Sequence, residues 1–141
     1  MAREGTHERR EGSNAEIVRR LYAVFNEGGS ASELLDPQIE YVNPPDAVES
    51  GTRHGTREWG AALRNIREGF GEPVVRVVRL FERGDLVATV IRMRIHGPLS
   101  GIKGEMTQSH LWTIRDGRGV RFEWFNDAEE AFRALESRSG P

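Results

Sequence analysis

The sequence contains no cysteine, and Lys103 is the one lysine among its 20 basic residues. Without cysteine the chain can form no disulfide, no thiolate nucleophile and no cysteine-ligated metal site. It also lacks any apolar run near the roughly 18 residues that cross a bilayer, so we expect no membrane partner. A length of 141 residues is enough for one hydrophobic core and predicts a single domain.

The first residues, MAREGTHERREGS, carry mixed charges and lack the apolar core that a secretory signal requires. They offer too little apolar surface to offset the entropy cost of ordering. We therefore expect a disordered leader over 1–13, a folded domain over 14–136 and a flexible tail over 137–141. The missing signal favours a cytoplasmic protein.

Positive charge is spread along the chain rather than gathered in one place. The net charge is -2 at pH 7, and the arginines are scattered. A nucleic-acid-binding domain shows a clustered basic surface instead. We therefore expect no nucleic-acid partner.

Capping residues and apolar spacing indicate helices at the start of the chain. Ser13 opens a capping box, and apolar residues then recur at helical spacing to about Glu27. A second box at Ser30 predicts a short helix that ends before Pro37. The third helix follows Gly55 and carries an apolar stripe of Trp59, Leu63, Ile66 and Phe70.

Alternating or continuous apolar segments predict five strands. They lie at 38–43, 73–82, 85–96, 104–114 and 120–126, and a helix capped at Asp127 closes the chain. Helices grouped first and strands grouped last are typical of an α+β fold. We expect the helices to pack on one face of a curved, mostly antiparallel sheet, an arrangement that encloses a pocket.

The last two strands decide which face of the sheet carries His110. A two-residue turn alone would pair His110 with Glu123, whereas a loop of odd length pairs it with Trp124 and pairs Trp112 with Phe122. Burial favours the second register, because the first would expose large aromatic side chains to water. The opposite set, Arg92, Arg94, Arg121 and Glu123, then forms a solvated or dimer-contacting face.

In this register the inner face changes from apolar near the hairpin to polar at its other end. Gln108, His110 and Asn126 are the polar residues, beside Trp112 and Trp124. Apolar walls with a few converging polar groups are typical of a small-molecule site. The alternative is that these polar side chains simply hydrogen-bond one another in a core.

The order of several short motifs resembles a known superfamily. The motifs are NEGG at the end of the first helix, YVNPPD, RHGTREW, GPLSG, HLWTIRDG and NDAEEA. Together they resemble the nuclear transport factor 2-like superfamily and, within it, the branch of SnoaL-like polyketide cyclases and ketosteroid isomerases, over residues 14–136. The resemblance implies a cone of helices over a curved sheet (a cystatin-like roll), a homodimer and a pocket in the cone. It does not fix an activity, because this scaffold carries many.

Residues that match the isomerase machinery are missing. Asn43 stands where the resemblance implies a carboxylate base, and an amide cannot take that proton. The oxyanion-hole tyrosine corresponds to Leu21, with Tyr22 one position away and so turned by about 100° around the helix. His110 occupies the place of the second acid. The resemblance therefore argues against steroid isomerisation.

SnoaL-like cyclases are similar to this chain in the Gln108-x-His110 pattern. Their acid on or after the last strand corresponds most nearly to Asp127, which makes His110 and Asp127 the candidate catalytic residues. The alternative for Asp127 is a structural one, as the N-cap of the last helix.

Other polar and aromatic residues complete the list of candidates. No histidine stands at metal-ligand spacing from another ligand, so no metal is assigned. Candidate substrate-binding residues are Gln108, Asn126, Trp112, Trp124, Asn43, Tyr22, Phe25 and Trp59. Aromatic residues on helix faces, such as Phe25 and Trp59, are more often part of a core.

Two functions follow from these observations. The first is an acid/base enzyme of the isomerase, cyclase or hydrolase class that acts without a cofactor on a small apolar carbonyl compound. In it His110, with a pKa near its ordinary value, transfers a proton and Gln108 or Asn126 holds the oxygen. The alternative is a non-catalytic ligand-binding or dimerisation module of the same fold.

Overall fold

A computed structural model describes residues 2–96 and 103–139. Its elements, in chain order, are α1 (Ala2–Glu27), the 3-10 helix η1 (Ser32–Leu34), β1 (Leu35–Asn43), β2 (Gly51–His54), α2 (Gly55–Phe70), β3 (Val74–Arg83), β4 (Leu86–His96), β5 (Lys103–Arg115), β6 (Arg118–Phe125) and α3 (Glu130–Ser139). The strands form one sheet in the order β2-β1-β6-β5-β4-β3. Every neighbouring pair is antiparallel except β1 and β6, which run parallel.

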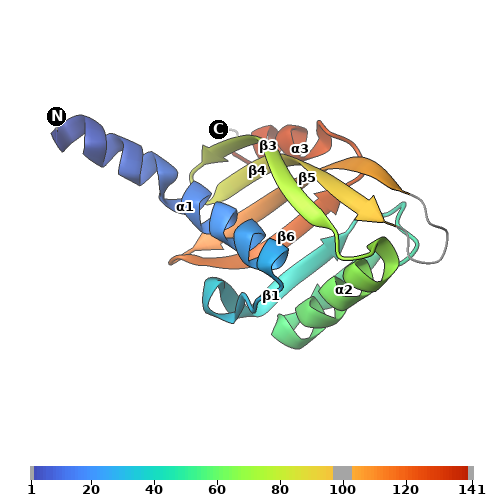
Figure 1. Cartoon of the computed structure of the whole chain (residues 1–141). Coiled ribbons are helices and arrows are strands. Elements are labelled where there is room, and N and C mark those ends of the chain that lie inside the picture. Colours follow the sequence, from blue (N-terminus) through green and yellow to red (C-terminus); the bar gives the residue numbers. More distant parts are fainter. Residues whose placement is uncertain (1, 97–102, 140–141) are drawn as a thin grey trace.

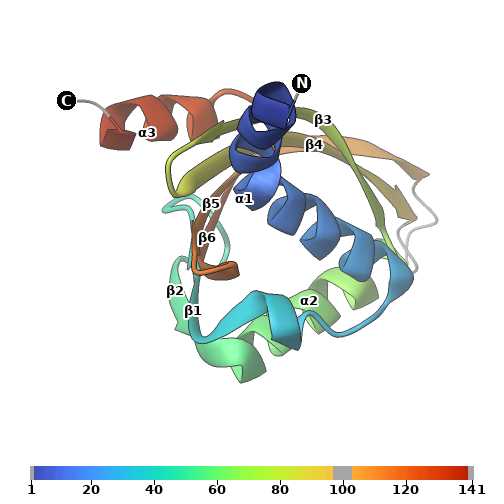
Figure 2. The ribbon, with the colours of Figure 1, turned by 90° about the vertical axis from the view of Figure 1, so that its left-hand side faces the viewer.

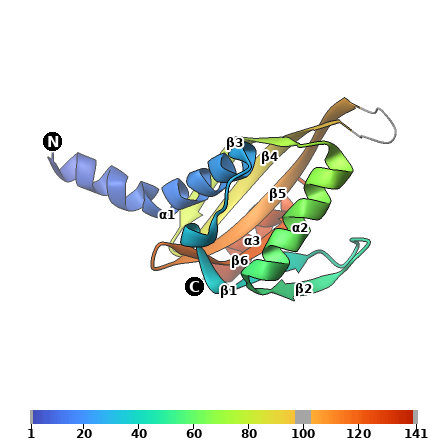
Figure 3. The same ribbon diagram turned by 60° about the horizontal axis from the view of Figure 1, so that its bottom comes forward.

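The sheet is strongly curved, and helices lie on both of its faces (Figures 1 and 2). The second half of α1 and the whole of α2 lie over the concave face, while α3 lies on the convex face. Figure 3 shows α2 running beside β1 and β2, where it closes one side of the cone. The predicted α+β architecture is therefore confirmed, but the expectation that the helices pack on one face is wrong for α3, whose Ala131 and Leu135 pack on the convex face.

The first helix is longer than the capping signals predict. It begins at Ala2, so Ser13 lies inside the helix and does not start it. The first part of α1 projects away from the sheet (Figure 1), whereas Val18, Leu21 and Tyr22 of the second part are buried. The leader at 1–13 and the domain bounds at 14–136 stay predictions.

The short helix predicted after Ser30 is only one 3-10 turn. Its cap position, Ala31, makes no side-chain hydrogen bond, and Leu35 already belongs to β1. Leu34 and Leu35 are both buried, and an extended backbone lets the chain bury both at the base of the cone. A four-residue strand that the sequence does not indicate, β2, then pairs with β1.

The turn between β5 and β6 has two residues, Asp116 and Gly117, and both adopt positive φ, 52° and 77°. This is the backbone of a type I′ turn, whose twist suits a hairpin. Arg115 and Arg118 flank it as a pair. The turn is thus the short one that, without a further irregularity, would place His110 opposite Glu123.

A bulge beside the turn restores the register that burial requires. Ile114 pairs with Gly119 and Thr113 with Arg121, which leaves Val120 as an extra residue. Beyond the bulge, the predicted pairs of Trp112 with Phe122 and His110 with Trp124 are present. A loop of odd length would also pair Ile114 with Val120, and that pair is absent because Val120 is the residue that bulges. The same loop would place Asn126 opposite Gln108, but Asn126 lies past the end of β6 and is not part of the ladder.

The convex face is solvated in part, because Arg92 and Arg94 of β4 are exposed. The part that α3 covers is not the solvated surface that the sequence predicts. Leu111 and Ala88 of the sheet pack there against Ala131 and Leu135 of α3. Glu123 is buried beneath the same helix, with a side chain only 5% exposed. Two contacts from Arg138 and one from Arg121 compensate its charge.

Candidate functional site

The concave side of the sheet and the two covering helices enclose a cavity of about 970 Å³. All three tryptophans of the chain, Trp59, Trp112 and Trp124, line it. Exposed residues near Val48 also belong to its lining, so the cavity opens to the surface beside the loop that joins β1 and β2.

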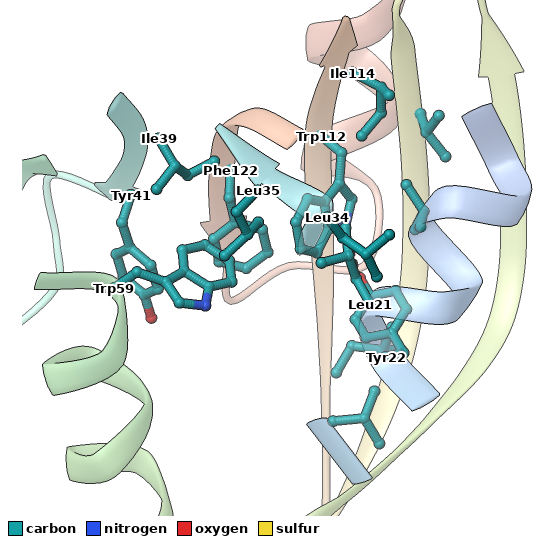
Figure 4. Close-up of a cluster of buried hydrophobic side chains, with 14 of the residues drawn as sticks. Leu21, Tyr22, Leu34, Leu35, Ile39, Tyr41, Trp59, Trp112, Ile114 and Phe122 are labelled. Atoms are coloured by element: carbon teal, nitrogen blue, oxygen red, sulfur yellow. Dashed lines mark hydrogen bonds between the residues drawn. The ribbon is translucent and has the colours of Figure 1, made fainter. Parts of the chain in front are cut away.

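Aromatic rings form one continuous wall of this cavity. Phe122 lies at its centre, with ring centroids 4.6 Å from Trp112, 5.2 Å from Tyr41 and 5.4 Å from Trp59. Figure 4 shows these side chains reaching inward from β1, β5, β6 and α2. Tilted and edge-on contacts of this kind hold aromatic groups in fixed orientations.

Tyr22 of α1 joins this wall to the polar end of the cavity. Its hydroxyl oxygen lies 2.6 Å from His110 Nδ1 and 2.8 Å from Thr89 Oγ1, and it accepts a hydrogen bond from Trp112 Nε1 at 3.0 Å. All four side chains are buried. The network therefore ties the first helix to β4 and β5 at one point.

The contact of the second ring nitrogen, Nε2, determines the tautomer of His110. His110 Nε2 lies 3.1 Å from Gln108 Oε1, an oxygen that can only accept, so Nε2 carries the hydrogen. Nδ1 is then an acceptor, and Tyr22 donates to it. Thr89 must in turn donate to Tyr22. The result is a directed chain of hydrogen bonds from Thr89 through Tyr22 and His110 to Gln108.

Burial sets the protonation states of His110 and Tyr22 in this hydrogen-bond chain. Loss of solvation lowers the pKa of His110 to about 3, far below its usual 6.5, so the imidazole is neutral at physiological pH. The expectation of a histidine near its ordinary pKa is therefore wrong. Burial also raises the pKa of Tyr22, which keeps the phenol protonated and able to donate.

Three hydrogen-bonding groups face the cavity without a protein partner. They are the Gln108 amide nitrogen, the Tyr41 hydroxyl and the Trp59 indole nitrogen, none of which makes a hydrogen bond within the described part of the chain. No buried side-chain nitrogen or oxygen of the described residues lacks a partner. These three groups must therefore be open to the cavity, which their residues line.

Asn43 and Asn126 lie toward the mouth. Asn43 Oδ1 accepts from Trp124 Nε1 at 2.7 Å, and its amide nitrogen donates to the Gly51 carbonyl at 3.2 Å. Asn43 thus orients an indole of the wall and joins β1 to β2. Asn126 lines the cavity where it is exposed to solvent.

Asp127 is not brought to the cavity. Its carboxylate accepts from the Glu129 backbone nitrogen at 2.6 Å, and its side chain is 57% exposed. Its backbone oxygen accepts from the Ser109 hydroxyl, which also accepts from the Ala131 nitrogen. These contacts support the structural alternative, in which Asp127 shapes the start of α3 on the convex side.

The other candidate residues, including Tyr22, Phe25 and Trp59, line the cavity. The resemblance places the family's tyrosine at Leu21, so Tyr22 was a candidate binding residue without its central position. Spacing contains the signal, because Val18 and Tyr22 are four residues apart and share a helix face. Thr89 was missed, since it stands in no motif. Tyr41, which opens the YVNPPD motif, was a possible cavity-lining aromatic residue, and it does line the cavity.

Among residues 2–96 and 103–139, no group of three or more His, Asp or Glu side chains is placed to hold a metal ion. No helix in the same part of the chain is long and apolar enough to cross a membrane.

The sequence of residues 18–122 matches the SnoaL-like domain family, which is more than half of the chain. The protein belongs to this family. Comparison with curated proteins finds no match. The recognition of a SnoaL-like domain from its motifs is therefore confirmed.

Several solved structures have the same fold. TerC, co-crystallised with polyporic acid, has 25% identity and a TM-score of 0.72, with 89% of this chain and 98% of TerC covered. A putative SnoaL-like polyketide cyclase from Jannaschia sp. has 21% identity and a TM-score of 0.71, with 93% and 94% covered. A nuclear transport factor 2-like protein of unknown function from Burkholderia pseudomallei has 24% identity and a TM-score of 0.72, with 86% and 95% covered.

Proposed function

We propose that this SnoaL-like protein is an enzyme that binds a small, mostly apolar carbonyl compound in the cavity and polarises its oxygen without a cofactor. The observation that carries the proposal is the hydrogen-bond chain from Tyr22 through His110, which ends on a Gln108 amide whose nitrogen is open to the cavity. The TerC complex supports ligand binding in this cavity, because TerC, which is 25% identical to this chain, was co-crystallised with polyporic acid.

The direction of the chain gives each residue a role. Tyr22 donates to His110, and His110 donates to the Gln108 oxygen, so both bonds draw electron density away from the Gln108 amide nitrogen. That N–H then becomes a stronger donor toward a carbonyl oxygen in the cavity. A fixed donor in a site of low dielectric stabilises an oxygen that gains negative charge as the neighbouring C–H bond breaks.

His110 acts through Gln108 in this arrangement and is a positioning residue. Both of its ring nitrogens are engaged, and its low pKa disfavours the charged form. The C–H proton passes to water at the open mouth. Enolisation is the shared first step of the isomerase and cyclase reactions, so this site serves either class.

Deuterium uptake tests the proposal without knowledge of the product. A panel of apolar aromatic β-dicarbonyl compounds is incubated with the protein in D₂O, and exchange at the carbon between the carbonyls is followed by NMR. The wild type should accelerate exchange of at least one compound. Gln108→Leu should remove about 10²-fold or more of the acceleration, in the range known for a single oxyanion donor.

Thr107→Ala is the matched control, because Thr107 precedes Gln108 on β5 but is exposed and does not line the cavity. It should exchange like the wild type. Equal rates for wild type and Gln108→Leu on every accelerated compound would refute the role of the amide.

A non-catalytic ligand-binding module is the second candidate. The observation in its favour is that Asn43, where a family base is expected, is an amide that hydrogen-bonds with Trp124 and Gly51 and cannot take a proton from a substrate. Under this alternative, compounds of the panel would bind and quench tryptophan fluorescence, yet no compound would exchange faster than in buffer. The cytoplasmic location and the homodimer also remain proposals.

A further inference from the structure

The rim of the cavity carries an unbalanced positive charge. Four arginines line it, Arg53, Arg57, Arg64 and Arg67, and Glu49 is the one carboxylate among the lining residues that the structure describes. The lining therefore has a formal charge of +3, in a chain whose net charge is -2. This concentration needs an explanation.

Helix geometry places three of these arginines along one side of α2. At 100° per residue, Arg57, Arg64 and Arg67 fall within an arc of about 80°, next to the arc of the apolar residues Trp59 and Leu63. The apolar arc packs toward the aromatic wall. Arg67 borders this arc, about 40° from Leu63, whereas Arg64 and Arg57 lie about 100° and 120° from Leu63. Arg57 and Arg64 are exposed and still belong to the cavity lining, so their guanidinium groups lie at its outer edge.

Two of the four arginines have protein partners that fix them. Arg53 pairs with Glu49 at 2.8 Å, and Arg67 donates to the Phe25 carbonyl at 3.1 Å while its guanidinium lies 4.7 Å from the centre of the Phe25 ring. Arg57 and Arg64 are exposed and form no ion pair within the described part of the chain. Their charge is available to a ligand.

The interior is matched to the same kind of ligand. Gln108, Tyr41 and Trp59 each offer a hydrogen-bond donor to the cavity, and no carboxylate accompanies them among the described residues of the wall. Burial raises the pKa of Tyr41 to about 12, so its hydroxyl keeps its proton. Donors inside and guanidinium groups at the rim both favour a ligand rich in oxygen and negatively charged.

We infer that the natural ligand is a carboxylic acid, with its apolar, carbonyl-bearing body against the aromatic wall and its carboxylate held by Arg57 and Arg64 at the rim. The inference rests on the proposed function, because it names the substrate class of that same cavity. A planar guanidinium binds a carboxylate through two parallel hydrogen bonds, which would anchor the body of the ligand in one direction.

Ligands that share one apolar body but differ in charge separate the contribution of the carboxylate from that of the body. A biphenyl-substituted γ-keto acid, its methyl ester and its primary amide are titrated into the full chain by calorimetry. The acid should bind about tenfold more tightly than either neutral compound. Added salt should weaken binding of the acid and leave the ester nearly unaffected, since only the acid is held at solvent-exposed charges.

The double variant Arg57→Gln/Arg64→Gln should lower the affinity of the acid to that of its ester. Arg118→Gln is the control, because Arg118 is exposed at the start of β6 and does not line the cavity. It should preserve the difference between acid and ester. If the ester binds as tightly as the acid to the wild type, the inference is wrong and the proposed apolar cavity stands. If neither compound binds, the ligand cavity itself is refuted.

Discussion

At the scale of single residues, the Tyr22 hydroxyl has the most partners of any side-chain group in the cavity. It serves His110, Thr89 and Trp112 at once, and all three are buried. Tyr41 stands on the opposite side of the same aromatic wall, and its hydroxyl has no partner in the described part of the chain. The two tyrosines therefore form a matched pair for measuring what the network contributes.

Tyr22→Phe should lower the free energy of unfolding by about 2–4 kcal/mol, because it leaves a buried ring nitrogen, a hydroxyl and an indole N–H without their partner. Tyr41→Phe should change it by less than about 0.5 kcal/mol, since a hydroxyl that faces an open cavity loses only water. Urea titrations of both variants measure the difference. Equal losses in the two variants would contradict the network.

At the scale of elements, α3 is held to the convex face partly by charge. Arg138 makes two contacts with the buried Glu123, whereas Arg133 on the same helix pairs only with exposed Asp127 and Glu130. Hydrogen bonds and charge from Arg138 and Arg121 outweigh the effect of burial and lower the pKa of Glu123, so the carboxylate stays ionised.

Arg138→Gln should destabilise the protein by about 1–3 kcal/mol, because it leaves a buried carboxylate with Arg121 alone. The value stays below that for a fully buried pair, since the Arg138 side chain is 44% exposed. Arg133→Gln is the control and should cost less than about 0.5 kcal/mol. Thermal unfolding and urea titration provide the measurement, and similar losses for both would show that Glu123 needs no partner from α3.

The link between α2 and β3 depends on a glycine. Gly71 has φ of 68°, and an added Cβ would lie 1.9 Å from the His96 carbonyl oxygen. Gly71→Ala should therefore destabilise by about 2 kcal/mol or more, from strain and from a forced shift of the neighbouring backbone. Gly69→Ala, in the last turn of α2 with open space around it, should instead stabilise by up to about 0.5 kcal/mol. Urea titrations check both signs.

Elements with apolar residues at helix or strand spacing, or with large side chains that must be buried, were predictable from the sequence. Elements that depend on tertiary contacts were not. The stripe of α2 and the pairing of His110 with Trp124 follow from burial alone, even though a bulge, not the loop length, produces that pairing. β2 was missed because its four residues, Gly51 to His54, have no apolar pattern and depend on pairing with β1. The short helix after Ser30 was overpredicted because a local capping signal competes with burial of Leu35.

Within the candidate site, the strand residues were easier to predict than the helix residues. Alternation on β5 fixes Gln108, His110 and Trp112 on one face once the register is known. The contact of Tyr22 with that face depends on how α1 crosses the sheet, which spacing along one helix does not determine. The pKa of His110 was also beyond sequence reasoning, because burial, and not any neighbouring charge, lowers it.

At the scale of the whole molecule, the buried imidazole links stability to pH. The folded chain keeps His110 neutral down to about pH 3, whereas the unfolded chain takes up a proton below its ordinary pKa of 6.5. Between pH 3 and pH 6.5 the His110 side chain therefore takes up a proton when the protein unfolds. The free energy of unfolding must fall as the pH is lowered through that window. Above pH 6.5 the effect is absent, since His110 is neutral in both states.

The expected slope is about 1.4 kcal/mol of unfolding free energy per pH unit between pH 6 and pH 4, in addition to what the carboxylates contribute. His110→Asn should be less stable than the wild type at pH 7, because its side chain cannot span from Tyr22 to Gln108. The same variant should lose less stability on acidification, since it has no imidazole to protonate on unfolding. Urea titrations of both proteins at several pH values give the difference directly, because the carboxylates are common to both. Parallel stability curves for the two proteins would mean that the imidazole is charged in the fold, and the directed chain from Tyr22 to Gln108 would then be wrong.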